Sequence, residues 1–164
     1  MLTLRLLSNE SSEDRANVLR VFSEASSYTE LVSGRAPCAD DVDDFFFGKP
    51  VSKSAADKSG FGLFLGETMI GCADVIRGYP TDDDVWIGLL LIAEAYQGQR
   101  YGTVALEALT EMASEWGYRN IQLAVVATNP RAHAFWEREG FEEIRRTANA
   151  KFTGEIVVLR RRIP

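Results

Sequence analysis

The 164-residue chain lacks several features that define common protein classes. Its two cysteines, Cys38 and Cys72, form neither a disulfide framework nor a metal-ligand pattern. No apolar run approaches the roughly 20 residues of a membrane span, and charged residues come too early for a signal peptide. These absences predict a cytoplasmic protein with reduced thiols, no metal and no membrane partner.

A surplus of basic residues is also missing. Lysine and arginine total 18 against 24 aspartates and glutamates, which gives a formal net charge of −6. Because phosphate backbones are bound by basic patches, we do not expect nucleic acid as the main partner. The acidic balance is mildly favourable to cationic small molecules such as amines.

Two familiar phosphate-binding signatures are absent. The chain has no Gly-Lys followed by serine or threonine, and Gly98 with Gly102 does not make Gly-x-Gly-x-x-Gly. What the chain does contain is a hydrophobic strand over residues 85–92, a glycine-containing turn, and then an amphipathic helix. The first N–H groups of a helix lack partners and carry partial positive charge, so the pattern predicts a phosphate or pyrophosphate site. Taken alone, a purely structural turn explains the pattern equally well.

Hydrophobic periodicity predicts one domain over residues 1–164, 46% hydrophobic and without repeats. It contains about seven strands and four helices in a mixed α/β sheet. The predicted strands cover residues 2–7, 61–65, 68–76, 85–92, 121–127, 141–146 and 155–161. One predicted helix begins after Ser11, and the other three cover residues 40–47, 103–116 and 129–140. The stretch 51–60 is interpreted as a polar loop.

Two separated segments carry a family resemblance. The first is the turn after the fourth strand, and the second follows the fifth strand about 30 residues later. The matching residues are Gln97, Gly102, Asn129, Ala132, Gly140 and Phe141. In their spacing and in the order of elements, they resemble the GNAT N-acetyltransferases.

The resemblance implies that strands four and five splay apart to admit acetyl-CoA as the acyl donor. The turn would supply backbone N–H groups to the pyrophosphate through Gln97, Gly98, Gln99, Arg100, Tyr101, Gly102 and Thr103. The backbone of Leu90, Leu91 and Ile92 would pair with the pantetheine amides, as an added strand would. Asn129 would hydrogen-bond the pantetheine arm, and Ala132, Phe135 and Trp136 would complete the cofactor-binding set.

Two residues depart from the family pattern. Arg100 stands where relatives usually have a glycine, which is tolerable if its backbone keeps helical dihedrals. Its side chain either contacts a phosphate or faces solvent. Trp136 stands where many relatives have a tyrosine that protonates the leaving thiolate. An indole has no accessible acid pKa, so packing against the cofactor arm is favoured over an acid role.

The acceptor side offers carboxylates. A primary ammonium must lose a proton before it attacks a thioester, and Asp84 is the first candidate for the base. Asp74, Tyr79, Asp82 and Asp83 are candidates for contacts with the acceptor. For any single aspartate of the 82–84 run, a solvated loop is the plainer interpretation.

The resemblance implies an enzyme that moves an acetyl group from acetyl-CoA to a primary amine of a small molecule or peptide. The transfer would occur by direct attack in a ternary complex. One alternative is an enzyme of the same fold with a longer acyl donor or an alcohol acceptor. Another is a non-catalytic acyl-CoA sensor or interaction module. The terminal strand pair is a common dimer edge in this architecture, which leaves a homodimer open.

Overall fold

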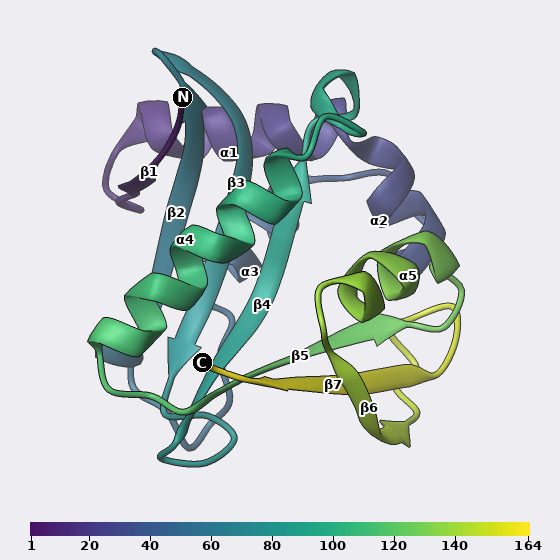
Figure 1. Cartoon of the computed structure of the whole chain (residues 1–164). Coiled ribbons are helices and arrows are strands. Elements are labelled where there is room, and N and C mark those ends of the chain that lie inside the picture. Colours follow the sequence, from purple (N-terminus) through teal and green to yellow (C-terminus); the bar gives the residue numbers. More distant parts are fainter.

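A twisted sheet with the strand order β1-β2-β3-β4-β5-β7-β6 runs through the molecule (Figure 1). The computed structural model describes residues 1–164. The strands are β1 (Leu2–Leu6), β2 (Lys58–Leu65), β3 (Thr68–Arg77), β4 (Asp84–Ile92), β5 (Asn120–Val126), β6 (Glu142–Thr147) and β7 (Ile156–Arg162). The seven predicted strands are therefore confirmed.

Strand direction divides the sheet into two parts. Every neighbouring pair is antiparallel except β4 and β5, which run parallel. The β2–β3 hairpin turns at Gly66, whose φ of 60° lies in the region that favours glycine. The strands β1 to β4 form one part, and β5 to β7 form the other.

Five α-helices accompany the sheet, one more than predicted. They are α1 (Ser12–Glu24), α2 (Ser26–Ser33), α3 (Ala39–Phe47), α4 (Tyr101–Glu115) and α5 (Pro130–Arg138), with 3-10 turns η1 (Ala55–Asp57) and η2 (Glu94–Tyr96). Ser11 caps α1 as expected, because its side chain accepts the N–H of Asp14. The helix that sequence reasoning missed is α2, which has no side-chain cap.

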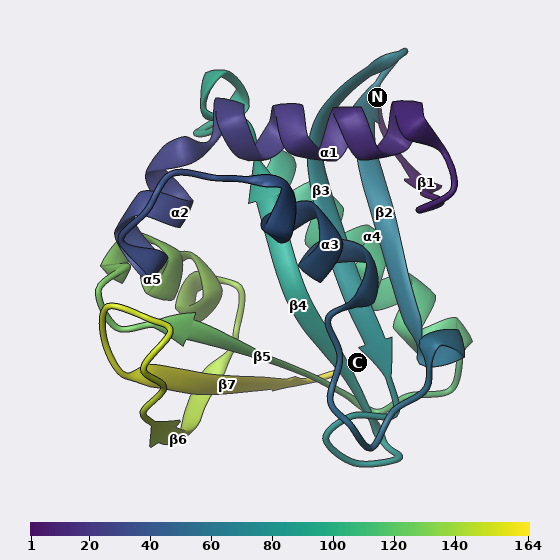
Figure 2. The ribbon, with the colours of Figure 1, turned by 180° about the vertical axis from the view of Figure 1, so that it is seen from behind.

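The helices cover both faces of the sheet. Helices α4 and α5 pack with strands β2 to β5 and β7 in a core that includes Leu106, Trp136 and Leu159. Helices α1 and α3 cover the opposite face of β2 to β4, and contribute Val18 and Phe45 (Figure 2). None of the helices is both long enough and apolar enough to cross a membrane.

Helix α2 connects the two parts of the sheet. At its start, the hydroxyl of Ser27 donates to the carboxylate of Glu94, just after β4. At its end, the N–H of Thr153 donates to the carbonyl of Val32 at 2.9 Å, and the Thr153 hydroxyl donates to that of Leu31 at 2.7 Å. Because Thr153 lies in the β6–β7 loop, α2 spans from the β4 part to the β7 part.

Candidate functional site

The parallel strands β4 and β5 pair over only part of their length. The paired residues run from Asp84 opposite Asn120 to Ile87 opposite Leu123. Beyond them β4 continues to Ile92 and β5 to Val126 without pairing with each other, so the two strands separate (Figure 1). The stretch of β4 whose edge toward β5 is free is five residues long, roughly 16 Å at 3.3 Å per residue. Unpaired strand edges are a template for an extended ligand with amide groups.

The separated end of β4 leads directly to a row of free backbone donors. The N–H groups of residues 98–103 have no acceptor in the protein, whereas the N–H of Gln97 already donates to the carbonyl of Glu94 at 3.2 Å. The helix α4 begins at Tyr101, two residues before the predicted start, and its first N–H groups point out of the helix end. Donors and helix dipole together make this turn a site for an anion.

Arg100 is the N-cap residue of α4 and adopts a left-handed conformation, with φ 69° and ψ 10°. Right-handed helical dihedrals, the condition under which a side chain at this position would be tolerable, are therefore not met. The left-handed region is crowded for a residue with a Cβ, and glycine is the residue that suits it. Arg100 is the only non-glycine residue with positive φ in the chain, and its side chain is exposed.

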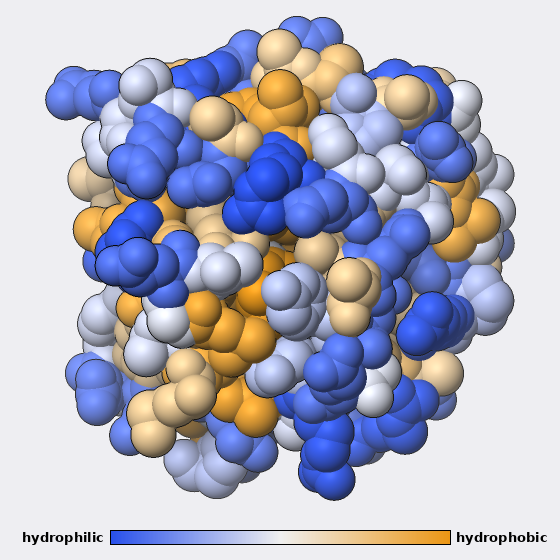
Figure 3. Space-filling model, turned by 90° about the horizontal axis from the view of Figure 1, so that it is seen from above, coloured by the Kyte–Doolittle hydropathy of each residue, from blue (hydrophilic) through white to orange (hydrophobic).

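The surface at this end of the molecule is mixed. Viewed from above, a hydrophobic area is bordered and interrupted by polar and charged side chains (Figure 3). Figure 1 shows the N-terminal end of α4 at the same end. The face that carries the free N–H groups is therefore not a continuous apolar docking face.

Asn129 stands at the start of α5, on the other side of the separation. Its Oδ1 accepts the N–H of Ala132 at 3.2 Å, so it is the helix N-cap, and its side-chain amide has no protein acceptor. Helix α5 also contacts the start of α4. A Cβ on Gly102 would lie 3.3 Å from the ring of Phe135, so the ring leaves little room for a side chain there.

The closed end of the separation contains a buried carboxylate. The register between β3 and β4 shifts by one residue after Asp74, which leaves Gly88 as a bulge between Ile87 and Leu89. A Cβ at Gly88 would lie 2.2 Å from Asp74 Oδ1, so the carboxylate touches the bulge. Lys58 Nζ donates to the same oxygen at 3.0 Å.

Burial raises the pKa of Asp74 to about 6, and the charge and hydrogen bond of Lys58 partly oppose this rise. The second oxygen, Oδ2, has no hydrogen-bond partner in the protein, yet it is not sealed from solvent. Asp74 is therefore a carboxylate with one fixed oxygen and one available oxygen. Sequence reasoning listed Asp74 as an acceptor contact and placed Asp84 ahead of it as the base. It missed Lys58, which it placed in a polar loop.

Comparison with known proteins identifies the family. The chain matches the Acetyltransferase (GNAT) family over residues 21–141. The chain belongs to this family. Family and fold together support acyl transfer from acyl-CoA as the general activity. Comparison with curated proteins gave no match.

Solved GNAT structures share the fold over almost the whole chain. An acetyltransferase from Thermus thermophilus is 30% identical, with a TM-score of 0.77 and coverage of 99% of this chain and 97% of that one. A putative GNAT acetyltransferase from Desulfovibrio desulfuricans is 16% identical, with a TM-score of 0.76 and full coverage of both chains. The ribosomal-protein-S18-alanine N-acetyltransferase from Escherichia coli is 17% identical, with a TM-score of 0.68 and coverage of 99% and 94%.

Trp136 of this GNAT chain is largely buried in α5. Its ring packs edge-on against Phe135 and Phe141, with centroids 4.9 and 5.2 Å away. Its indole N–H has no acceptor in the protein and is not sealed from solvent. The side chain is therefore mainly a core residue whose one polar atom stays available.

The predicted acceptor residues near Asp84 lie at the paired end of β4, away from the opening. Asp84 is buried, and both of its oxygens are engaged. Oδ1 accepts from Asn120 at 3.0 Å, while Oδ2 accepts from the Thr81 hydroxyl at 2.8 Å and from Gln122 at 3.2 Å. These contacts fasten the β3–β4 loop to β5.

The remaining members of that group are peripheral. Asp82 and Asp83 are exposed in the β3–β4 loop, and Tyr79 packs edge-on against Trp86 with ring centroids 5.5 Å apart. The structure does not bring Asp82, Asp83 or Tyr79 into contact with Asp74. No group of three or more His, Cys, Asp or Glu side chains is placed to hold a metal ion.

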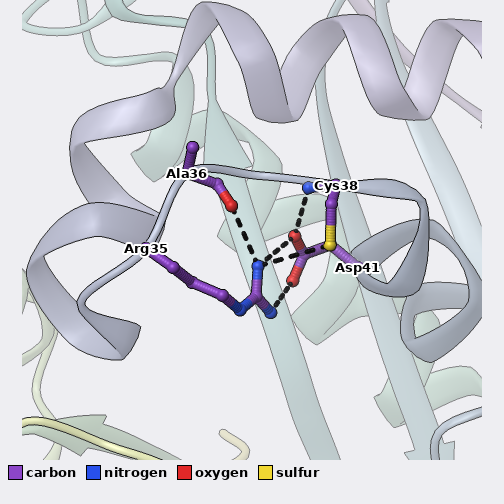
Figure 4. Close-up of polar contacts among 4 residues, drawn as sticks. All are labelled: Arg35, Ala36, Cys38 and Asp41. Carbon is purple, nitrogen blue, oxygen red and sulfur yellow. Dashed lines mark hydrogen bonds and ion pairs between the residues drawn. The ribbon is translucent and has the colours of Figure 1, made fainter.

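The loop between α2 and α3 is held by a compact polar cluster (Figure 4). Arg35 makes two hydrogen bonds to Asp41, at 2.8 and 2.9 Å, and the N–H of Cys38 donates to Asp41 at 2.8 Å. The Arg35 guanidinium lowers the pKa of the Asp41 carboxyl.

The other cysteine, Cys72, is buried on β3. Burial raises the pKa of its thiol, so it is not an activated nucleophile.

Proposed function

We propose that this protein transfers the acetyl group of acetyl-CoA to a primary amine of a small molecule or peptide. The observation that carries the proposal is the row of free N–H groups at residues 98–103, placed at the end of the unpaired edge of β4. A pyrophosphate fits the donors, and an extended arm with amide groups fits the edge. No single motif in the sequence carries both features.

Each part of the chain has a role in holding the donor. The N–H groups of residues 98–103 would bind the pyrophosphate, and the backbone of residues 90–92 would pair with the pantetheine amides. The free side-chain amide of Asn129 would contact the pantetheine arm from the β5 side. When bound, acetyl-CoA supplies an acetyl group as a thioester.

The chain would activate the thioester through its backbone. A β4 N–H group near the closed end would donate to the thioester carbonyl and stabilise the negative charge that develops on its oxygen. The amine would attack directly, because the buried thiol of Cys72 has no histidine partner and a raised pKa. The indole N–H of Trp136 would contact the departing sulfur without protonating it.

Two measurements test this function. Free-thiol release from acetyl-CoA should depend on an added amine from a panel of polyamines, amino acids, aminoglycosides and N-terminal peptides. S-acetylpantetheine, which lacks the pyrophosphate, should bind at least about 100-fold more weakly than acetyl-CoA, because it loses charge-assisted hydrogen bonds. Equal affinity for both donors would refute the anion site.

The same assay addresses the alternative of an acyl-CoA sensor. Tight acetyl-CoA binding with no amine-dependent thiol release across the whole panel would refute the enzyme and favour the sensor. Release that requires an alcohol, or a longer acyl-CoA, would refute the proposed acceptor or donor while keeping the fold's general chemistry.

A further inference from the structure

The Asp74 carboxylate lies where the proposed reaction would need a proton acceptor. With the pyrophosphate at residues 98–103 and the arm along residues 90–92, the acetyl end of the donor would extend toward the Gly88 bulge. Asp74 Oδ1 is the atom that a Cβ at Gly88 would meet at 2.2 Å. The carboxylate therefore lies beside the closed end of the strand separation, a location that Asp84 does not share.

The hydrogen bonds of Asp84 and Asp74 also favour Asp74 as the proton acceptor. Both oxygens of Asp84 accept bonds from protein groups and have a structural task. Asp74 binds Lys58 through Oδ1 only; Oδ2 has no hydrogen-bond partner in the protein, on a side chain that is 7% exposed. Lys58 is itself anchored, since its Nζ also donates to the carbonyl of Gly48 at 2.6 Å.

We propose that Asp74 is the catalytic base that takes the proton from the acceptor ammonium, and that Lys58 is a positioning residue that fixes Oδ1 and leaves Oδ2 to the acceptor. This inference rests on the proposed function. The partner class is an aliphatic primary ammonium, because one open carboxylate oxygen on a buried side chain selects a compact cation that carries protons.

The acetyl transfer releases two protons from the acceptor nitrogen. One ammonium proton passes to Asp74 Oδ2 and later to solvent. The nitrogen lone pair forms the N–C bond to the acetyl carbonyl carbon, and the C–S bond breaks with its electron pair on sulfur. A second N–H proton passes through water to the thiolate, which gives the amide and free CoA.

The groups that face Asp74 set its proton affinity. Lys58 on β2 stabilises the charged form, whereas burial and the charge of Asp44 on α3 oppose it. Tyr28 on α2 and Cys72 on β3 also lie close, but burial raises the pKa of Tyr28 to about 12 and raises that of Cys72. Both therefore remain protonated at neutral pH, where Asp74, with a pKa of about 6, is mostly ionised.

The first test compares the wild type with Asp74→Asn, using acetyl-CoA and the amine of the panel that turns over fastest. For the wild type we expect kcat/KM to fall as pH drops through about 6. Asp74→Asn should lower kcat/KM at pH 7 by about 100-fold or more and should lose this acidic limb, the fall of kcat/KM at low pH. Its affinity for acetyl-CoA should change by less than about threefold. A variant within about threefold of the wild type, with the same limb, would overturn the assignment but leave the proposed function intact. A wild type with no amine-dependent turnover would overturn both.

The second test moves the limb without touching Asp74. Lys58→Met should shift it to higher pH by about one to three units, because the stabilising charge is lost. Asp44→Asn should shift it to lower pH by a few tenths of a unit. Asp43→Asn is the matched control on the same helix: Asp43 is exposed, pairs with Arg15, and should leave the limb in place. If Lys58→Met does not fold, Asp44→Asn serves as the test by itself. An acidic limb at the same pH in Asp44→Asn and in the wild type would then contradict the proposal.

Discussion

Arg100 offers a test of the turn in which backbone strain and charge can be separated. Its left-handed conformation costs an L-residue about 1–2 kcal/mol, whereas glycine escapes that cost but loses about 0.5–1 kcal/mol of backbone entropy on folding. Arg100→Gly should therefore be more stable than Arg100→Ala by about 0.5–1 kcal/mol. For a domain of this size that difference corresponds to about 1–4 °C in Tm.

The comparison between the two variants isolates the backbone, since both remove the same charge. Unfolding free energies from urea titration and Tm from calorimetry give the stability difference. If Arg100 also contacts a phosphate, both variants should bind acetyl-CoA equally weakly, about 3–10-fold below the wild type, and the loss should shrink at high salt. An alanine variant as stable as the glycine variant would refute the left-handed placement of Arg100.

Three other contacts lead to predictions of their own. Asp84→Ala should lower the free energy of unfolding by about 2–4 kcal/mol in urea titrations, because the buried Gln122 amide loses its acceptor, while acetyl-CoA binding persists. Asp74→Asn should gain stability relative to the wild type as pH rises from about 4 to about 6. The folded wild type binds the proton of the Asp74 carboxyl more tightly than the unfolded chain does, so its free energy of unfolding falls over that window by at most about 1.4 kcal/mol per pH unit. A difference in unfolding free energy between variant and wild type that does not change with pH would contradict the raised pKa. Gly102→Val should destabilise the α4–α5 contact by about 1–3 kcal/mol and weaken acetyl-CoA binding by calorimetry, since its Cβ would crowd the Phe135 ring.

Sequence reasoning reached the features that local chemistry determines. The apolar run of β4, the glycine-containing turn and the amphipathic α4 follow one another directly, so the free helix end could be predicted from residues 85–116 alone. The strand separation could be predicted only from the family resemblance, because pairing between β4 and β5 ends at Ile87 through contacts distant in sequence. No periodicity reports where two paired strands part.

The features that sequence reasoning missed depend on tertiary contacts. Helix α2 has three serines and no capping side chain, and its ends are fixed by Glu94 and Thr153, which are far away in the chain. The role of Asp74 depends on Lys58, which lies at the boundary between a polar stretch and β2. The left-handed conformation of Arg100 could be known only from the structure of the helix cap, because an arginine in a sequence does not indicate its own backbone dihedrals.

The free N–H groups of residues 98–103 belong to the main chain, and every amino acid except proline supplies the same donor. An alanine at residue 99 or 101 would therefore leave the donor in place, whereas a proline there would remove it; at Gly98 and Arg100 the left-handed backbone excludes proline altogether. The same fact bears on descent: apart from the left-handed residues 98 and 100 and the tightly packed Gly102, the side chains of this turn can change while the ligand keeps its donors. A site built in this way outlasts the sequence similarity by which it is usually found.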